Sequence, residues 1–163
     1  MVENKCVFCD LEPIRQRIIW ENDLFFSLFD AYPVSPGHCL IIPKRHVTDV
    51  ASMNAEESAS LFAAIAEILA IVKQTDLKDV YIDILKNPPS GNAIWFLQKA
   101  IANPNINTPP DGYNYGINDG RAAGRTVDHL HLHILPRYLG DVDNPLGGVR
   151  YVIPEMGNYK KVR

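Results

Sequence analysis

The sequence predicts an α+β protein that combines an antiparallel sheet of about five strands with one long helix and one shorter helix. Two observations favour this class. Short β-rich runs bounded by turn residues occur near both ends of the chain, and one long amphipathic segment lies between them. With 163 residues, 47% of them apolar and 21% charged, the chain is expected to form one domain over residues 1–163 without needing disulfides.

The first strands are predicted to be a hairpin and a buried strand. Residues 17–20 and 24–30 are β-rich and flank the turn-forming residues 21–23. A turn with two prolines and a glycine follows at 32–37, and the apolar run at 38–43 is typical of a strand buried on both faces. Three strands are therefore expected before residue 44.

One long helix is predicted at about residues 55–74. Asn54 and Glu57 have the spacing of a capping pair, in which each side chain bonds the other residue's backbone N–H. Apolar residues then recur at helical spacing through Leu61, Ile65 and Ile68. The segment is too short and too charged to cross a membrane.

The region 79–111 is harder to interpret. Residues 79–86 fit either a strand or a helix, whereas residues 92–102, bounded by prolines, predict a shorter helix. We expect Trp95 and Phe96 to anchor this region on the rest of the chain.

Two more strands, at 113–119 and 128–136, are predicted to pair through the glycine-containing connection at 120–125. The remaining tail, 139–163, has several Gly and Pro residues and no strong periodicity.

The last predicted strand carries three of the five histidines. His129, His131 and His133 alternate with apolar residues, and the period of two in a strand places the imidazoles on one face and the aliphatic side chains on the other. Neighbouring imidazoles are then about 7 Å apart. The remaining histidines, His38 and His46, flank the predicted strand at 38–43.

Three interpretations of the alternating histidines are open. They are polar residues on a solvated face, ligands of a zinc ion, or a nucleophile with its supporting groups. Thr, Lys or Glu would more often fill a solvated face, and Gly116, Gly120 and Gly124 indicate that something approaches the neighbouring backbone closely. Spacing alone does not choose between zinc ligands and a nucleophile.

Composition excludes several partners. The net charge of -3 gives no basic field for nucleic acid or for an anionic membrane, so an anionic ligand is expected to be a small molecule. Residues 1–10 contain charges and no long apolar stretch, so we expect no secretory signal and a cytoplasmic location. Cys6 and Cys9 form a C-x-x-C pair, which in a cytoplasmic chain favours metal or redox use over a structural disulfide.

The histidine pattern resembles a known family. The run His129-Leu130-His131-Leu132-His133-Ile134-Leu135 matches the signature of the histidine triad (HIT) superfamily of nucleotide hydrolases and transferases. Residues 29–46 resemble the ribose-binding strand, turn and following strand of that family, and residues 118–127 resemble its phosphate-side loop. The tail is similar to that of bacterial members described as diadenosine polyphosphate hydrolases. The resemblance implies a HIT-like core at about 5–138, with 79–111 as an insertion.

The resemblance also implies catalytic roles. His131 matches the nucleophile, which attacks the α-phosphate and forms a nucleotidyl-histidine that water hydrolyses. Its tautomer would be fixed by a backbone carbonyl at Nδ1. His133 and His38 match positions that contact phosphoryl oxygens, and His129 matches a supporting position.

Substrate-binding roles follow in the same way. Asp30 matches the acceptor of the ribose hydroxyls, and Asn118 and Thr126 match donors near the phosphates or the leaving group. Phe29 and Leu28, together with Phe8 and Leu40, are candidates for the wall of a base pocket, although plain core packing is favoured as the single role of these four residues. Arg125 stands where many members have Gln, and a positive fork there would favour long polyphosphates.

A structural zinc ion is a separate expectation. Cys6 and Cys9 supply half of a tetrahedral site, which His46 and His129 would complete as in some bacterial HIT proteins. The alternative is a pair of reduced thiols. No cofactor is expected to be required for the chemistry.

The function that the resemblance implies is hydrolysis of nucleoside phosphate anhydrides or esters of the diadenosine polyphosphate type, and the same resemblance implies a homodimer. The alternatives are an AMP phosphoramidate hydrolase of the same superfamily, a nucleotide-binding sensor with little turnover, and a hydrolase in which the three triad histidines bind a catalytic zinc ion.

Overall fold

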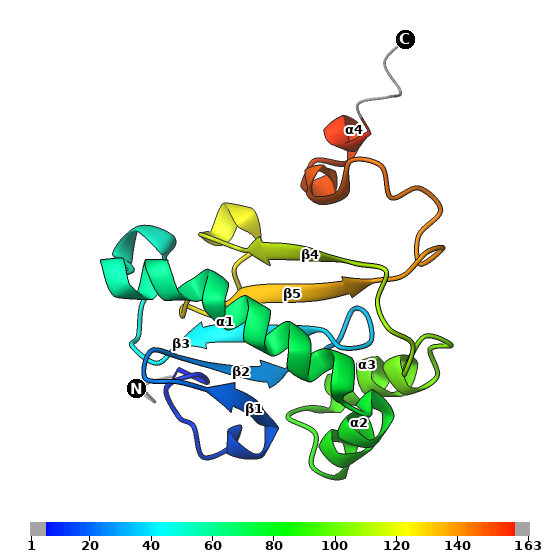
Figure 1. The fold of residues 1–163 in the computed structure, drawn as a ribbon, viewed down its shortest axis with the longest axis horizontal. Coiled ribbons are helices and arrows are strands. Elements are labelled where there is room, and N and C mark those ends of the chain that lie inside the picture. Colours follow the sequence, from blue (N-terminus) through cyan, green and yellow to red (C-terminus); the bar gives the residue numbers. More distant parts are fainter. Residues whose placement is uncertain (1–5, 159–163) are drawn as a thin grey trace.

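A computed structural model describes residues 6–158 and confirms the α+β class (Figure 1). Five strands form one sheet in the order β1-β2-β3-β5-β4, and every neighbouring pair is antiparallel. The strands are β1 (Ile18–Glu21), β2 (Phe25–Phe29), β3 (Cys39–Pro43), β4 (Gly112–Ile117) and β5 (Leu132–Arg137). The α-helices are α1 (Ala55–Gln74), α2 (Leu77–Lys86), α3 (Gly91–Ile101) and α4 (Pro154–Gly157). Short 3-10 helices occupy Arg15–Arg17, Val50–Ser52, Arg121–Ala123 and Gly148–Val152.

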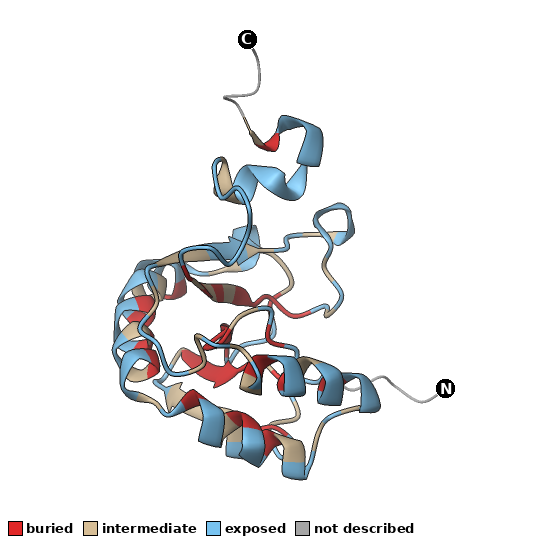
Figure 2. Cartoon of the chain, turned by 90° about the vertical axis from the view of Figure 1, so that its right-hand side faces the viewer, coloured by how far each residue is buried: buried red, intermediate tan, exposed pale blue. Residues whose placement is uncertain are grey.

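Helix α1 lies across one face of the sheet, and buried residues concentrate on the strands and on the helix faces turned toward them (Figures 1 and 2). Alternate residues of a strand point to opposite faces, so the sheet has a core on each side. Phe25 and Phe29 of β2 join the cluster beneath α1, whereas Phe26 and Leu28 join a second cluster on the other face. The N-terminal segment contributes Phe8 to that second cluster.

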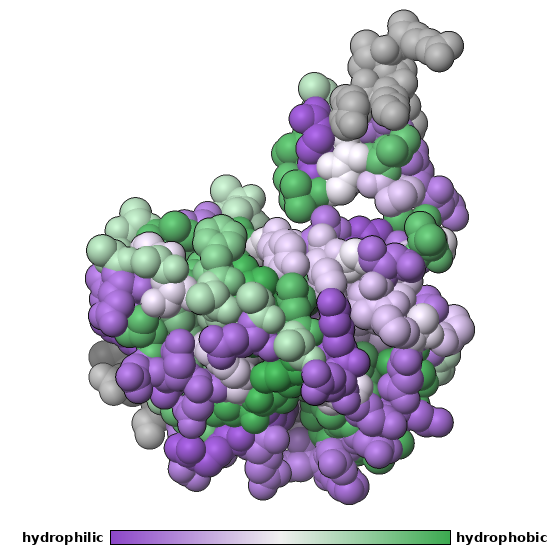
Figure 3. Space-filling view, viewed as in Figure 1, coloured by the Kyte–Doolittle hydropathy of each residue, from purple (hydrophilic) through white to green (hydrophobic). Residues whose placement is uncertain are grey.

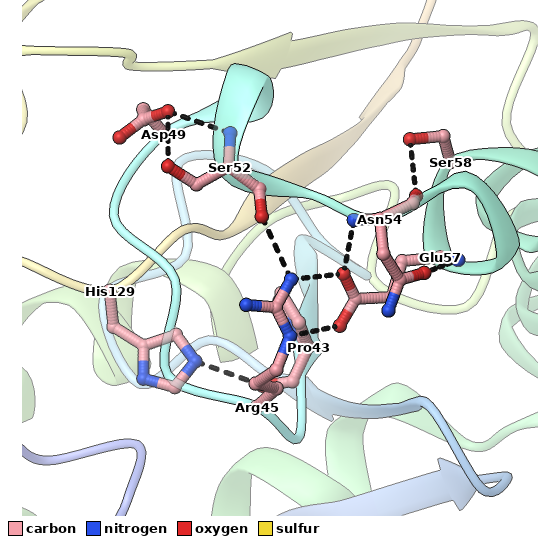
Figure 4. A network of polar contacts seen from close by, with 8 residues as sticks. All are labelled: Pro43, Arg45, Asp49, Ser52, Asn54, Glu57, Ser58 and His129. Atoms are coloured by element: carbon pink, nitrogen blue, oxygen red, sulfur yellow. Dashed lines mark hydrogen bonds and ion pairs between the residues drawn. The ribbon is translucent and has the colours of Figure 1, made fainter.

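The predicted start of α1 is confirmed. The Asn54 side chain accepts the backbone N–H of Glu57 at 2.8 Å, and the Glu57 carboxylate accepts that of Asn54 at 2.8 Å. Glu57 is only 2% exposed, and its carboxylate also receives two hydrogen bonds from the Arg45 guanidinium, at 3.0 and 2.6 Å (Figure 4). This pairing fixes the residues that follow β3 to the first turn of the helix.

The region predicted as 79–111 contains two helices. Residues 79–86, which fitted either a strand or a helix, belong to α2, and the shorter predicted helix is α3. The expectation that Trp95 anchors this region is wrong, because its side chain is 58% exposed. Tyr81 and Leu97 are fully buried in the cluster beneath α1 and provide the anchor.

The last strand begins later than predicted. Its pairing with β4 starts only at Leu132, opposite Ile117, and not at residue 128. The chain ahead of β5 turns toward the residues after β3 instead, where the backbone N–H of Leu130 donates to the carbonyl of Val47 at 2.7 Å. His129 and His131 therefore lie ahead of the ladder, and His133 lies within it.

The C-terminal residues stand away from the body of the molecule (Figures 1 and 3). They form the short helices at Gly148–Val152 and Pro154–Gly157, as expected for a tail without periodicity. Several of their apolar side chains are exposed, including Val152, Ile153 and Met156. Within residues 6–158, no helix has the length and apolar character needed to span a membrane.

Glu57 generates a test of the fold. We expect Glu57→Ala to lower the free energy of unfolding by about 2 kcal/mol, because the cap is lost and the Arg45 guanidinium loses its carboxylate. Urea unfolding measures this change. The matched control is Glu56→Ala, an exposed residue of the same helical turn, for which a change within about 0.5 kcal/mol is expected.

The effect of Glu57 also depends on pH. Hydrogen bonds from Arg45 lower the pKa of the Glu57 carboxyl. Its stabilisation is therefore fully present above the pKa of an unfolded glutamate and is lost as the pH falls through the lower, folded-state pKa. If Glu57→Ala and Glu56→Ala lowered the free energy of unfolding equally at neutral pH, this account would be contradicted.

Candidate functional site

The alternating histidines line the sheet face opposite α1. His133 pairs with Leu40 across β3 and β5 and shares its face, whereas Leu132 and Ile134 pack into the cluster beneath α1. The rings of His131 and His133 have centroids 5.0 Å apart. Phe8 packs edge-on against His131, with ring centroids 5.4 Å apart. The imidazoles and the aliphatic side chains thus occupy opposite faces.

The ring of His131 has a defined hydrogen position. Its Nδ1 lies 2.8 Å from the backbone carbonyl of His129. A carbonyl oxygen only accepts, so Nδ1 carries the hydrogen. The Nε2 lone pair of a neutral His131 is then free, which is the state that a nucleophilic imidazole requires.

His38 and His133 form a hydrogen-bonded pair, with His38 Nε2 3.0 Å from His133 Nδ1. The backbone N–H of Val34 lies 3.4 Å from His38 Nδ1; when Nδ1 accepts it, His38 donates from Nε2 and His133 carries its hydrogen on Nε2. That last nitrogen is buried and has no hydrogen-bond partner among residues 6–158. In this tautomer it is an N–H donor left for a ligand.

Burial keeps this pair neutral. It lowers the pKa of His38, partly offset by the charge of Asp30. For His133, burial together with the neighbouring His38 and His131 lowers the pKa to about 4. Both shifts favour the uncharged form of the two rings near neutral pH.

Asp30 lies at the start of the turn that leads to His38. One carboxylate oxygen accepts the backbone N–H of Tyr32 at 2.9 Å, and the other lies 3.5 Å from His38 Nδ1. The turn is closed by the backbone N–H of Asp30, which donates to the carbonyl of His38 at 3.0 Å. The carboxylate is only 16% exposed.

The hydroxyls of two buried tyrosines form hydrogen bonds with the backbone of this turn. The hydroxyl of Tyr81 accepts the backbone N–H of Gly37 at 2.8 Å, and the hydroxyl of Tyr138 donates to the carbonyl of Pro36 at 3.1 Å. Gly37 has φ +83°, and a Cβ there would lie 3.1 Å from side-chain atoms of Pro136 and Val72. Sequence reasoning missed both tyrosines. The only signal for Tyr81 was the capping pattern of α2, whose Asp76 accepts from Lys78 and Asp79.

The two predicted base-pocket residues of β2 lie on opposite faces of the sheet. Leu28 packs with Phe8 and Leu40 on the histidine face. Phe29 packs beneath α1, where its ring meets that of Tyr81 with centroids 6.4 Å apart, and it also lines a cavity at the end of β2.

Asn118 and Thr126 are exposed at the other side of the histidine row. Asn118 directly follows β4, two residues after Gly116, which is the cross-strand partner of His133. A Cβ on Gly116, Gly120 or Gly124 would meet open space, so the backbone on this side is accessible to a ligand.

The Arg125 side chain is fixed by contacts with Thr48 and Asp128. Its guanidinium donates to the carbonyl of Thr48 at 2.6 Å, and its Nε lies 3.2 Å from the Asp128 carboxylate. These contacts tie the loop after β4 to the chain that follows β3.

Cys6, Cys9, His46 and His129 come together beside the triad, with one ligand atom of each lying within 4.8 Å of the others. Cys9 Sγ lies 3.2 Å from Nδ1 of His46, and Cys6 Sγ lies 3.4 Å from Nδ1 of His129. His129 Nε2 donates to the carbonyl of Pro43 at 2.9 Å, which leaves Nδ1 free to bind a metal (Figure 4). Two thiolates and two imidazoles suit tetrahedral zinc, and a ligand histidine ordinarily makes such a second contact.

Comparisons with known proteins show the family to which the chain belongs. The sequence profile of the HIT domain matches residues 12–140. An uncharacterized HIT-like protein of Mycoplasma genitalium is 31% identical over 137 residues, which cover 83% of this chain and 74% of that protein. A bis(5'-adenosyl)-triphosphatase of Dictyostelium discoideum is 30% identical over 132 residues, which cover 80% of this chain and 67% of that protein.

A solved structure shows the same fold. The crystal structure of a HIT family protein from Bacillus anthracis matches with a TM-score of 0.56 at 26% identity, covering 85% of this chain and 77% of that one. The profile match extends over most of the chain and includes every triad histidine. On this ground the chain belongs to the HIT family.

Proposed function

We propose that the protein is a nucleotide hydrolase that cleaves nucleoside phosphate anhydrides or esters of the diadenosine polyphosphate type through a nucleotidyl-histidine intermediate. The observation that carries the proposal is the hydrogen bond from His131 Nδ1 to the carbonyl of His129, which leaves the Nε2 lone pair free on the sheet face opposite α1. The Dictyostelium relative, by its name a bis(5'-adenosyl)-triphosphatase, supports the substrate class.

The reaction has two steps. His131 Nε2 attacks the α-phosphorus, so that a P–N bond forms while the P–O bond to the leaving group breaks and the leaving group departs with the electron pair. Water then attacks the same phosphorus and loses a proton, the P–N bond breaks, and the nucleoside monophosphate leaves. His131 is restored. A difficult single displacement is thereby replaced by two easier ones.

The surrounding residues stabilise charge and position the substrate. The free Nε2–H of His133 donates to a non-bridging phosphoryl oxygen, with His38 fixing its tautomer from behind. Asp30 accepts the ribose hydroxyls. We assign the exposed Asn118 and Thr126 to contacts on the leaving-group side. Arg125 shapes that side through its bonds to Thr48 and Asp128.

The zinc group has a structural role in this proposal. When bound by Cys6, Cys9, His46 and His129, zinc supplies a cross-link between the N-terminal segment and the chain around β3 and β5. His131 and His133 are outside this ligand set and perform the chemistry without a metal. The thiols must stay reduced to bind zinc, which is consistent with the expected cytoplasmic location.

A trapped intermediate tests the mechanism. We expect intact mass spectrometry, after brief mixing with diadenosine tetraphosphate and a quench that spares P–N bonds, to show one AMP on the wild-type chain. His131→Ala should show none, because the attacking nitrogen is lost. The control Glu56→Ala should still carry the adduct, since Glu56 is an exposed residue of α1, on the sheet face opposite the histidines.

Other outcomes separate the alternative functions. An adduct from an AMP phosphoramidate but not from the tetraphosphate would identify the phosphoramidate hydrolase. AMP binding without an adduct or turnover on either substrate would contradict the hydrolase function and favour a nucleotide-binding sensor.

Metal analysis tests the zinc group. We expect about one zinc ion per chain after purification, and its loss in Cys9→Ala, because tetrahedral zinc needs all four ligands. The control Cys39→Ala removes a buried thiol outside the group and should keep the metal. Zinc retained by Cys9→Ala would refute the assignment. Activity lost on chelation while the folded structure persists would favour the catalytic zinc hydrolase.

Self-association belongs to the proposal as well. β4 is an edge strand, and its Tyr115 and Gly116 are exposed, so its outer backbone groups are available to a second copy. We expect a homodimer with about twice the chain mass of 18.3 kDa in sedimentation equilibrium. A monomer at all concentrations up to the solubility limit would contradict it.

A further inference from the structure

The chain just before His38 has the geometry of a type II β-turn, with Pro36 and Gly37 as its central residues. The backbone N–H of His38 donates to the carbonyl of Ser35 at 3.1 Å and closes the turn. Gly37 has φ +83°, which the second central residue of a type II turn requires. Type I and type II turns differ in the orientation of the central peptide group, so the contacts of this group set the shape of the turn.

Two tyrosine hydroxyls bind the two ends of that central peptide group. Tyr81 of α2 accepts the N–H of Gly37 at 2.8 Å, and Tyr138, directly after β5, donates to the carbonyl of Pro36 at 3.1 Å. Both tyrosines are buried. Burial raises the pKa of both hydroxyls, to about 12 for Tyr138, so both keep their hydrogens at neutral pH. The peptide group is therefore held from both ends by neutral, buried groups.

The same turn carries two groups of the proposed site. The backbone N–H of Asp30 donates to the carbonyl of His38 at 3.0 Å, and the Asp30 carboxylate lies 3.5 Å from His38 Nδ1. On its other side, His38 Nε2 lies 3.0 Å from Nδ1 of His133. A different orientation of the peptide group between Pro36 and Gly37 would therefore displace both His38 and the proposed ribose acceptor bonded to it.

The insertion also contacts the start of the turn. The hydroxyl of Ser90, at the beginning of α3, lies 2.8 Å from that of Tyr32, and the ring of Phe96 meets the ring of Tyr32 with centroids 5.7 Å apart. The backbone N–H of Tyr32 donates to the Asp30 carboxylate at 2.9 Å. Tyr32 is exposed, whereas Tyr81 is fully buried, so water does not compete for the bond that Tyr81 makes.

We propose that Tyr81 and Tyr138 are positioning residues for the turn that carries Asp30 and His38, and that helix α2 thereby sets how strongly the protein binds the ribose hydroxyls. This inference rests on the proposed function, because it takes Asp30 as the acceptor of those hydroxyls. A carboxylate that the turn has already oriented loses less conformational freedom when the ligand binds, so more of the hydrogen-bond energy becomes affinity. The region 79–111 then acts on the site without touching the substrate.

Removal of a single oxygen atom tests the inference. Tyr81→Phe leaves the buried N–H of Gly37 without its acceptor, and Tyr138→Phe removes the bond at the other end of the same peptide group. The matched control is Tyr113→Phe, because the Tyr113 hydroxyl is buried and has no hydrogen-bond partner among residues 6–158. NMR titration gives the dissociation constants of AMP and of its 2',3'-dideoxy analogue, which lacks both ribose hydroxyls. Thermal melting verifies that each variant is folded at the temperature of the titration.

We expect wild type to bind AMP about tenfold more tightly than the dideoxy analogue, because Asp30 accepts the hydroxyls. Tyr81→Phe should reduce this ratio to about threefold or less, Tyr138→Phe should also reduce it, and Tyr113→Phe should preserve it.

A lower melting temperature with an unchanged ratio in Tyr81→Phe would indicate a purely structural role and overturn the inference. If Tyr81→Phe does not fold, an unchanged ratio in Tyr138→Phe overturns it instead. Equal binding of both ligands by wild type would refute the role of Asp30 in the proposed function, and the inference with it.

Discussion

Antiparallel pairing of β3 with β5 brings together groups that the sequence keeps far apart, and both candidate sites depend on it. With Leu40 opposite His133, the start of β3 places His38 beside the triad. The end of β3 places the carbonyl of Pro43, which lies three residues before His46, against His129. One ladder thus positions the imidazoles of His38 and His133 at one end and the cysteine-histidine group at the other.

The hydrogen bonds around the triad have a direction. A backbone N–H, from Val34, begins the chain that passes through His38 and ends at the free Nε2–H of His133. A backbone carbonyl, from His129, orients His131 the opposite way and leaves a lone pair. His133 therefore presents a hydrogen-bond donor beside the lone pair of His131. Contacts with the backbone set the two different hydrogen positions.

The sequence was sufficient for the features that depend on local pattern. Alternation at His129, His131 and His133 predicted the two faces, and the pair Asn54 and Glu57 predicted the start of α1. It failed where a tertiary contact overrides local preference. The segment ahead of β5 bonds to Val47 and not to β4, and Trp95 is exposed although its size suggested an anchor. The bond between Tyr81 and Gly37 joins residues 44 positions apart, and no local signal encodes it.

His129 takes part in two arrangements through different atoms. Its carbonyl orients the ring of His131, and its imidazole lies with Cys6, Cys9 and His46. Under the proposed function, a bound zinc ion and the orientation of the His131 ring would therefore share one residue. Linkage is reciprocal, so whatever free energy such a metal added to nucleotide affinity, the nucleotide would return to metal affinity. The two proposed sites would then be coupled through His129 without any direct contact between metal and nucleotide.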